Sequence, residues 1–375
     1  MNEPLRIGVI GAGQIAQTHF KNYSQIPEVR VVAVADLFPE KVDAAKSNFG
    51  IADGYSDFKE LLARDDIDAV DVCVHNNKHA PITIAALRAG KHVYCEKPMA
   101  GTYRDAADML AAARECGKML HIQMSTLYER ETRAARRLIE DGELGKIYYA
   151  RSFGFRRRGR PFVDGYGTAN FVDKSISAGG ALFDMGIYHI SQILHLIGNP
   201  AVQTVTGAAH QELDMYEDRR AFSGYSVEEM GLGWVRMEGG VSFDIEETWA
   251  VHHDGQESSK ILGRKGGLRL NPLTYFSSLS DMPYSATFDT KESDSRWHSC
   301  DPEMVWYDSS QKHWAGALMG RVPLLPTAEY GLNAALISEG IYLSSKLGRE
   351  LTADEIREQS RGTAIDPYTP EKVWK

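Results

Sequence analysis

The chain has 375 residues, of which 43% are hydrophobic and 25% are charged, a composition typical of a globular protein with room for two separate cores. Its formal net charge of -9 argues against nucleic acid as a partner, because that affinity depends on lysine and arginine neutralising phosphates. No apolar run approaches the roughly 20 residues that span a bilayer, so a membrane partner is not expected either.

The four cysteines lie far apart and show none of the paired spacings of a zinc site or a disulfide framework. Such cysteines are expected to be reduced thiols in a reducing compartment. The first predicted strand begins at Leu5, which leaves no room before it for the apolar stretch and cleavage site of a signal peptide. The sequence therefore predicts a cytoplasmic protein.

Short β-branched runs alternate with helical stretches from Leu5 to Met124. This alternation predicts βαβ units and a mostly parallel sheet, because each strand needs a crossover helix before the next can run in the same direction. Gly50, Gly90 and Gly117 directly follow helical runs, where a left-handed C-cap is favoured. We expect an α/β domain over residues 1–124.

The segment GVIGAGQIAQTHF places Gly11, Gly13 and Ala16 as G-x-G-x-x-A between the first strand and the next helix. Gly11 permits the tight turn, Gly13 lets the backbone approach a pyrophosphate, and Ala16 lets the helix lie close to the sheet. Gln14 and Ile15 open that helix, whose free N–H groups and positive dipole end favour phosphates. The pattern predicts a dinucleotide-binding turn.

Asp36 ends the second strand about 20 residues later, where a carboxylate can accept hydrogen bonds from the adenosine ribose hydroxyls. Its charge would repel a 2′-phosphate, and Leu37 and Phe38 follow it rather than a serine or arginine that could bind one. The first domain is therefore predicted to be a Rossmann domain that binds NAD rather than NADP.

Glu96, Lys97 and Pro98 lie at the carboxyl end of a parallel strand, the edge where open α/β sheets place their ligands. A lysine at a strand end is more often solvated than catalytic. This tripeptide, however, is typical of the glucose-fructose oxidoreductase / inositol dehydrogenase (Gfo/Idh/MocA) family, which the chain resembles. The resemblance extends from the glycine turn to the segment TAEYGLNAALISEGIYLSSKLGRE near the C-terminus. Pro98 is a candidate for a cis peptide bond.

The resemblance implies an NAD(P) oxidoreductase of two domains that acts on sugars, cyclitols or related polyols. It places Glu96 and Lys97 at the cofactor, and it matches Asn76 and His79 to an N-x-x-H element near the nicotinamide ribose. The chain departs from the family pattern at His75, where proline is usual, and in the residues after Gln123, which lack an arginine pair often found there.

After a helix predicted around Arg133 to Asp141, the chain changes to longer strands that alternate apolar and polar residues. Strands of period two without intervening helices indicate an antiparallel, half-exposed sheet. Two helices are expected, one starting near Gly180 and one from about Thr327 to Lys346. Residues 125–375 are thus predicted to form an α+β domain with a large open, mostly antiparallel sheet for substrate binding and oligomerisation.

The segment SAGGALFDMGIYHISQIL predicts a helix that carries Asp184, Tyr188 and His189. On a helix of 3.6 residues per turn, Tyr188 shares the face of Asp184, while His189 points about 140° away. The chain resembles the family branch with tyrosine at this position. Tyr188 is then the predicted proton acceptor, Asp184 a ligand of a substrate hydroxyl, and Lys97 the cation that lowers the pKa of the phenol.

His189 is the competing base, because an imidazole needs little adjustment to act near neutral pH. It would replace Tyr188 if the helix began one residue later or carried a bulge. The tract FRRRGRPF gathers four arginines that could face an acidic sugar, although a solvated loop or a subunit contact is favoured.

These observations predict hydride transfer between nicotinamide and a secondary ring hydroxyl or ketone of a sugar, glycoside or cyclitol, with no metal required. Two alternatives stay open: a redox-neutral enzyme that retains its NAD, and a sensor of NAD or sugar without turnover. An exposed antiparallel sheet would need cover between subunits, so a homodimer or homotetramer is expected.

Overall fold

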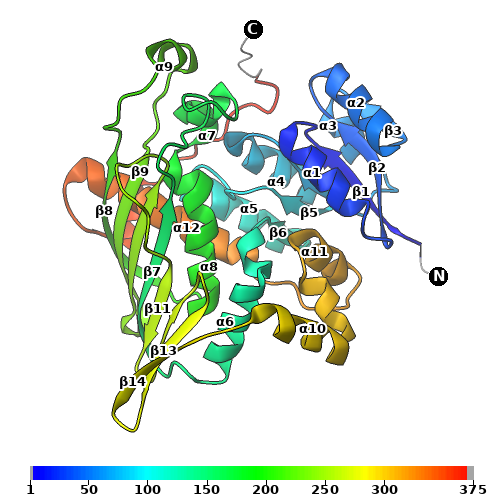
Figure 1. Ribbon diagram of the computed structural model, residues 1–375. Coiled ribbons are helices and arrows are strands. Elements are labelled where there is room, and N and C mark those ends of the chain that lie inside the picture. Colours follow the sequence, from blue (N-terminus) through cyan, green and yellow to red (C-terminus); the bar gives the residue numbers. More distant parts are fainter. Residues whose placement is uncertain (1–2, 370–375) are drawn as a thin grey trace.

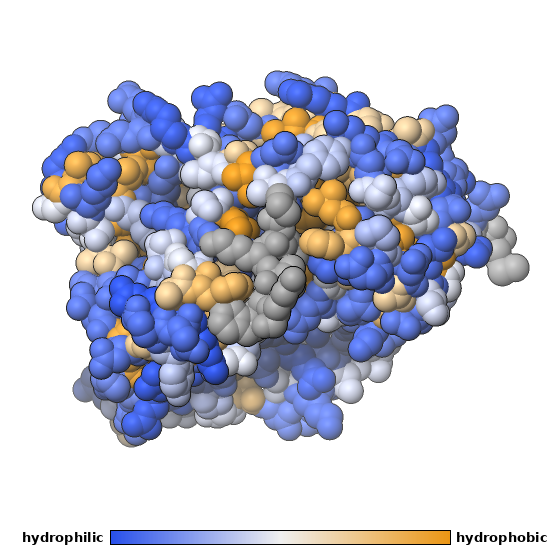
Figure 2. Space-filling view, turned by 90° about the horizontal axis from the view of Figure 1, so that it is seen from above, coloured by the Kyte–Doolittle hydropathy of each residue, from blue (hydrophilic) through white to orange (hydrophobic). Residues whose placement is uncertain are grey.

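The computed structural model describes residues 3–369, and within them the chain forms two β-sheets with helices packed between and around them (Figure 1). No helix in this range is long and apolar enough to cross a membrane. Seen from above, the surface is mostly hydrophilic, with small scattered hydrophobic groups (Figure 2).

The N-terminal sheet has the strand order β3-β2-β1-β4-β5-β6, and each of its ladders is parallel, which confirms the predicted Rossmann arrangement. Its strands are β1 (Leu5–Ile10), β2 (Val29–Ala35), β3 (Asp53–Tyr55), β4 (Ala69–Val72), β5 (His92–Cys95) and β6 (Leu120–Ile122). Its helices are α1 (Gln14–Tyr23), α2 (Pro39–Phe49), α3 (Phe58–Leu62), α4 (His79–Arg88) and α5 (Tyr103–Glu115). The strand order reverses between β1 and β4, so the ligand-binding crevice lies at their carboxyl ends.

The C-terminal sheet has the strand order β14-β13-β12-β11-β7-β10-β9-β8-β15. Its ladders are antiparallel except for β7 with β10, which run parallel, so the predicted mostly antiparallel sheet is confirmed. Its strands are β7 (Ile147–Phe155), β8 (Val202–His210), β9 (Met230–Met237), β10 (Ser242–Thr248), β11 (Lys260–Gly263), β12 (Gly267–Arg269), β13 (Thr274–Leu279), β14 (Met282–Thr287) and β15 (Leu351–Thr352).

Helices α8 and α12 pack on one face of this sheet, and α12 also contacts α5 and β6 of the first sheet. The helices of this part are α6 (Arg130–Glu140), α7 (Lys174–Ser177), α8 (Ile187–Ile197), α9 (Glu217–Ser223), α10 (Thr290–Cys300), α11 (Ser310–Leu318), α12 (Thr327–Leu347) and α13 (Ala353–Gln359). The sequence does not predict α10, because its residues TKESDSRWHSC are mostly polar and lack a strong apolar period.

Helix α11 belongs to the core of the first sheet although it comes late in the chain. Its Trp314 is fully buried against Tyr94 of β5 and Ala69 of β4. The predicted domain division at residue 124 falls between β6 and a short helical turn, Ser125–Tyr128. Because α11 and α12 pack on the N-terminal sheet, this division stays a prediction.

Candidate active site

The glycine turn after β1 packs closely against the next strand of the sheet. Gly11 has a φ of +97°, and a Cβ atom there would lie 2.2 Å from the carbonyl oxygen of Cys73, so any other residue would clash. At Gly13 a Cβ atom would meet nothing within 4 Å, so the backbone faces open space. Gln14 begins α1, and Ala16 is fully buried beneath it.

Asp36 ties the end of β2 to this turn. Its Oδ2 accepts a hydrogen bond from the backbone N–H of Ala12 at 2.7 Å, and its Oδ1 accepts one from Phe38 at 2.9 Å. A small cavity of about 50 Å³ adjoins the carboxylate, and its lining includes Lys78 and Pro367. Lone pairs of Asp36 that the backbone does not use can face a ligand in this cavity.

Asn76 is the first residue of a short 3-10 turn after β4, Asn76–Lys78, and His79 directly follows this turn. The Asn76 amide donates to the carbonyl of Ser177 at 2.7 Å. His79 is fully buried, and its ring nitrogens lie 2.7 Å from the carbonyl oxygen of Pro98 and 3.0 Å from that of Val74. His79 thus positions the loop after β5 by holding it against the loop after β4.

Glu96 joins a buried cluster beneath the crevice. Its Oε1 lies 2.8 Å from His19 Nε2, and the other ring nitrogen of His19 lies 2.7 Å from Asp71 Oδ2. Burial lowers the pKa of His19, but Asp71 together with the neighbouring Cys73 raises it by more, so this pKa lies well above that of free histidine. A protonated His19 therefore bridges two carboxylates, and Glu96 Oε2 in turn accepts the backbone N–H of Lys97.

Lys97 follows β5, and its peptide bond to Pro98 is cis. Its Nζ donates at 2.9 Å to both the carboxylate and the main-chain carbonyl of Asp184, and it lies 4.7 Å from the centre of the Tyr188 ring. Burial lowers the pKa of Lys97, but the charges of Asp184, Tyr188 and Glu96 raise it by more. Lys97 is therefore a fixed cation, and the structure brings together the three residues predicted to act on the substrate.

The helix that carries Asp184 begins with a π-helical turn, Leu182–Gly186, and continues as α8. The prediction of regular helical spacing is therefore wrong in this turn. Within this turn Lys97 Nζ binds the main-chain carbonyl of Asp184, and such π turns occur frequently at functional sites. The wider turn leaves both Tyr188 and His189 lining one cavity.

Trp249 and Arg156 complete the surroundings of Asp184. The indole Nε1 of Trp249 donates to Asp184 Oδ2 at 3.0 Å, and Arg156 Nη1 lies 3.7 Å from the same oxygen. These partners and Lys97 lower the pKa of the Asp184 carboxyl against the effect of burial, which raises it. Neither residue was selected from the sequence, because a solvated loop was favoured for the arginine tract and a core or interface position is usual for an aromatic residue on a strand.

The arginine tract divides between the site and the core. Arg156 lines the cavity beside Tyr188, whereas Arg160 is fully buried and pairs with Asp164 and Glu229 at 3.0 and 2.8 Å. Arg160 therefore has a structural role in the fold. The sequence analysis expected a solvated loop here and did not predict a buried arginine.

The pKa of Tyr188 is raised rather than lowered, because burial disfavours the phenolate more than the charge of Lys97 favours it. Lys97 lowers the pKa of this phenol, as expected, but its effect is smaller than that of burial. Lys97 lies over the ring rather than at the hydroxyl, and its charge is already paired with Asp184. Among the described residues the Tyr188 hydroxyl has no hydrogen-bond partner.

His189 is hydrogen bonded to a buried carboxylate that the sequence analysis missed. Its Nδ1 lies 2.9 Å from Glu247 Oε2, and Glu247 also accepts a hydrogen bond from Ser152. Burial lowers the pKa of His189, but Glu247 raises it by more. A signal was present in the sequence: Phe243, Ile245 and Glu247 alternate along β10, so the acid occupies a position facing the core.

Tyr188 and His189 open into a polar cavity of about 870 Å³ between α8 and the C-terminal sheet. Its lining includes Ser125, Thr126 and Glu129 after β6, Phe153 and Arg156 at the end of β7, and Glu257, Ser259 and Asn271 near β11. Ser125 and Thr126 lie where the sequence lacks the expected arginine pair. The cavity is large enough for a small hydroxylated ligand.

Residues 5–124 match the model of an oxidoreductase family with an NAD-binding Rossmann fold, and residues 132–269 match the GFO/IDH/MocA C-terminal domain. The chain is 32% identical over 279 residues to D-glucoside 3-dehydrogenase of Escherichia coli (strain K12), covering 72% of this chain and 78% of that protein. It is 28% identical over 194 residues to myo-inositol 2-dehydrogenase of Thermotoga maritima, covering 52% and 55%.

The WlbA dehydrogenase of Bordetella pertussis, whose crystal structure contains NADH and UDP-GlcNAcA, has a similar fold. Its TM-score is 0.76 at 22% identity, and the match covers 94% of this chain and 98% of that chain. Both sheets of the present structure thus have counterparts in a solved protein. From the two domain matches and the relative at 32% identity, the chain belongs to the GFO/IDH/MocA family of oxidoreductases, whose N-terminal domain is an NAD-binding Rossmann fold.

Proposed function

We propose that this protein transfers a hydride between NAD and a secondary ring hydroxyl or ketone of a sugar, glycoside or cyclitol. One observation carries the proposal: the Lys97 ammonium is fixed by Asp184 and lies against Tyr188 at the carboxyl end of β5, beside a polar cavity. A fixed cation over the ring of a tyrosine, whose hydroxyl has no partner among the described residues, is suited to an alcohol that loses a proton while its carbon loses a hydride.

The residues at the crevice fit NAD. The open backbone at Gly13 leaves room for a pyrophosphate, and the N-terminus of α1 faces the same space. Asp36 keeps lone pairs for ribose hydroxyls, and its negative charge disfavours the 2′-phosphate of NADP. When bound, NAD supplies the hydride acceptor at the nicotinamide ring.

Each residue of the cluster has a separate part in the proposed reaction. Tyr188 takes the proton from the substrate hydroxyl, and Lys97 stabilises the negative charge that develops on the substrate oxygen. Asp184 orients a substrate hydroxyl with the lone pairs that Lys97 and Trp249 leave free. Since burial raises the pKa of Tyr188, proton transfer depends on positive charge from Lys97 and from the bound cofactor.

His189 is a second candidate for the proton acceptor, and its bond to Glu247 favours it. A buried carboxylate holds an imidazole in one orientation and stabilises the imidazolium that forms. The position of Lys97 over the Tyr188 ring supports Tyr188 as the proton acceptor, because a cation at that distance stabilises a phenolate. Tyr188 remains the proposed base.

The substrate class rests on the relatives and on the cavity. A D-glucoside and myo-inositol are named as substrates of the two curated relatives, and both are neutral rings with several secondary hydroxyls. The cavity beside Tyr188 presents hydroxyl, amide and carboxylate side chains that suit such rings. We therefore propose a neutral ring as the substrate rather than an acidic one. In this proposal Arg156 stabilises the charge of Asp184 and does not bind a substrate carboxylate.

The test is the formation of NADH when the purified protein is given NAD and a panel of hexoses, methyl glucosides, inositols and uronic acids. We expect sustained NADH formation with a neutral ring compound, and a loss of about 10²-fold or more in turnover for Lys97→Ala with NAD binding little changed. The exposed Lys146 provides the matched control, and Lys146→Ala should keep wild-type turnover.

Other outcomes would change the proposed function. NADH that stops at a single equivalent per chain would indicate a redox-neutral enzyme that retains its cofactor. NAD binding without turnover of any compound in the panel would indicate a sensor. Unchanged turnover in Lys97→Ala would contradict the role given to Lys97.

A further inference from the structure

Two side chains from neighbouring strands of the C-terminal sheet converge on the carboxylate of Asp184. Strands β7 and β10 run parallel with Thr248 opposite Phe155, so Arg156 and Trp249 directly follow the paired ends. The backbone N–H of Arg156 donates to the carbonyl of Thr248 at 2.9 Å, which keeps the two strand ends together. An indole N–H and a guanidinium therefore approach Asp184 from the same edge of the sheet.

Trp249 is held rigidly in this position. Its side chain is fully buried in a small apolar cluster. Its backbone N–H donates to the carbonyl of Glu229 at 2.7 Å, and its own carbonyl accepts a hydrogen bond from Gly159 at 2.8 Å. The indole N–H therefore meets Asp184 Oδ2, 3.0 Å away, from a fixed direction.

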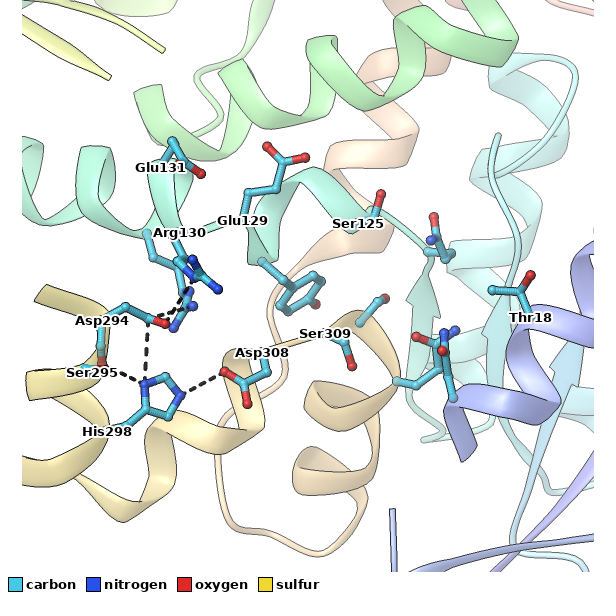
Figure 3. A pocket seen from close by; sticks show the side chains of 16 residues that line it. Thr18, Ser125, Glu129, Arg130, Glu131, Asp294, Ser295, His298, Asp308 and Ser309 are labelled. Carbon is cyan, nitrogen blue, oxygen red and sulfur yellow. Dashed lines mark hydrogen bonds and ion pairs between the residues drawn. The ribbon is translucent and has the colours of Figure 1, made fainter. Parts of the chain in front are cut away.

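The carboxylate of Asp184 lies between two cations. Lys97 Nζ is 2.9 Å from its Oδ1, and Arg156 Nη1 is 3.7 Å from its Oδ2. Arg130, in a second cavity of about 860 Å³, faces Asp294 instead (Figure 3). A guanidinium can bind a carboxylate through two parallel hydrogen bonds, whereas an ammonium acts as a point charge. Arg156 is therefore a strong competitor for the carboxylate that Lys97 holds.

The two cations are less free to move than the carboxylate. Arg156 donates to the hydroxyl of Tyr166, and its guanidinium lies 5.6 Å from the centre of that ring. Lys97 has a second bond, to the main-chain carbonyl of Asp184 at 2.9 Å, which does not depend on the carboxylate. The hydrogen bond from Trp249 to Oδ2 thus opposes the one movement that remains, which is rotation of the carboxylate toward Arg156.

We propose that Trp249 is a positioning residue, which keeps the carboxylate of Asp184 in contact with Lys97 rather than with Arg156. Without the indole N–H, the carboxylate turns to the guanidinium and no longer serves a substrate hydroxyl beside Lys97. This inference rests on the proposed function, which it deepens by assigning the group that holds the substrate-binding carboxylate in place.

The structural test uses two variants that lack the indole N–H. One is Trp249→Phe, and the other has β-(3-benzothienyl)alanine at position 249, in which sulfur replaces the N–H and the shape of the ring is kept. In crystal structures of both, we expect the Asp184 carboxylate to lie closer than about 3.2 Å to Arg156 and to have left Lys97. A carboxylate that stays on Lys97 in both variants overturns the proposal.

This test is independent of turnover, so it separates failure of the inference from failure of the proposed function. A carboxylate that moves to Arg156, in a protein that oxidises no compound of the panel, supports the role of Trp249 and rejects the proposed reaction.

The kinetic test asks whether removing the competing cation restores the site. Trp249→Phe should lower kcat/KM for the best substrate of the panel about 30-fold, mostly through KM, because Asp184 is the proposed ligand of a substrate hydroxyl. Adding Arg156→Met to this variant should bring kcat/KM to within about threefold of Arg156→Met alone. A double variant no more active than Trp249→Phe overturns the proposal.

Trp314→Phe is the matched control for loss of a buried indole. Trp314 is also fully buried, and its Nε1 has no hydrogen-bond partner within residues 3–369. We expect this variant to keep kcat/KM within about twofold of the wild type. A loss in Trp314→Phe equal to that in Trp249→Phe would reduce Trp249 to a packing role and overturn the proposal.

Discussion

Two neighbouring side chains at the start of α8 compete for the proton of the substrate. Tyr188 has an unpartnered hydroxyl and a nearby cation, but burial raises its pKa. His189 has an ordinary pKa closer to neutrality and a buried carboxylate, Glu247, that fixes its ring. The π turn before them makes both accessible from one cavity, so position alone does not decide between them.

Tyr188→Phe should lower kcat by about 10²- to 10⁴-fold, the usual range for loss of a general base, while His189→Gln should lower it by less than about tenfold. The Phe variant keeps the ring against Lys97, so NAD binding should be unchanged. Steady-state kinetics with the best substrate of the panel measures both effects. In His189→Gln, the acid limb of the pH profile should stay where it is in the wild type.

The reverse pattern would assign the base to His189. A loss in His189→Gln that exceeds the loss in Tyr188→Phe, with disappearance of the acid limb, contradicts the role of Tyr188. The acid limb would then report the pKa of His189, which Glu247 raises.

His19 affects the site without touching the crevice. It bridges Asp71 and Glu96 beneath Lys97, so its protonation is coupled to folding. Replacing it with glutamine leaves two buried carboxylates without the cation between them. We expect the free energy of unfolding to fall by about 3–5 kcal/mol, the range for breaking a buried ion pair.

The pH dependence of that loss follows from the raised pKa of His19. A group whose pKa is higher in the folded state stabilises fully below its unfolded value, about 6.5, and this stabilisation disappears as the pH rises through the folded value. Urea unfolding should therefore show a larger difference between wild type and His19→Gln at about pH 6 than at about pH 9. His92 provides the control, because burial lowers its pKa. The difference in unfolding free energy between wild type and His92→Gln should therefore not decrease from about pH 6 to about pH 9 as it does for His19→Gln. A difference that grows with pH would contradict a protonated His19.

The C-terminal segment lies beside Asp36, where we propose that the adenosine ribose binds. Pro367 lines the small cavity beside Asp36, and the Tyr368 hydroxyl donates to Asp57 at 2.6 Å. The segment is also bound to the turn after β4, since Ile365 N–H donates to the carbonyl of Asn77 at 3.0 Å. Residues far beyond the Rossmann strands thus form part of the wall of the nucleotide site.

Deletion of residues 362–375 should weaken NAD binding about tenfold and accelerate NAD release, because the ribose end of the crevice loses one wall. Fluorescence titration gives the dissociation constant, and stopped-flow displacement gives the rate. Tyr368→Phe removes one hydrogen bond but keeps the ring against Phe58, so it should have a much smaller effect. Unchanged affinity and release rate in the truncated chain, at an unchanged melting temperature, would contradict this role.

At the scale of the whole molecule, the C-terminal sheet has helices on one face and large exposed apolar side chains on its strands. These side chains are Tyr148 on β7, Trp234 on β9, Phe276 and Leu279 on β13, and Met282 and Tyr284 on β14. Aromatic and aliphatic groups gathered on one sheet favour contact with another chain. A homodimer or homotetramer therefore stays our prediction.

Light scattering at micromolar concentration should give two or four times the mass of one chain. Trp234→Glu should shift the protein toward the monomer, because a buried charge at a subunit contact is costly. Leu347→Glu, at an exposed apolar position at the end of α12, should leave the mass unchanged. A monomeric wild type would end the prediction.

Elements with local sequence signals could be predicted before the structure was known. The period of the strands, the glycines after helices and the G-x-G-x-x-A turn predict the Rossmann domain, and the structure confirms it with positive φ angles at Gly50, Gly90 and Gly117. Lys97, Asp184 and Tyr188 could be selected because the short motifs that contain them resemble those of the family. These features depend on neighbours within a few residues, which a sequence displays directly.

The assembly of the site depends on contacts between distant parts of the chain. Asp184 meets Lys97 across 87 positions and Trp249 across 65, and no local pattern encodes such pairs. The bond from Lys97 to the carbonyl of Asp184 falls within the π turn, and the raised pKa of Tyr188 comes from burial. Burial and long-range charge depend on atoms from distant parts of the chain, and so they exist only once the fold has formed.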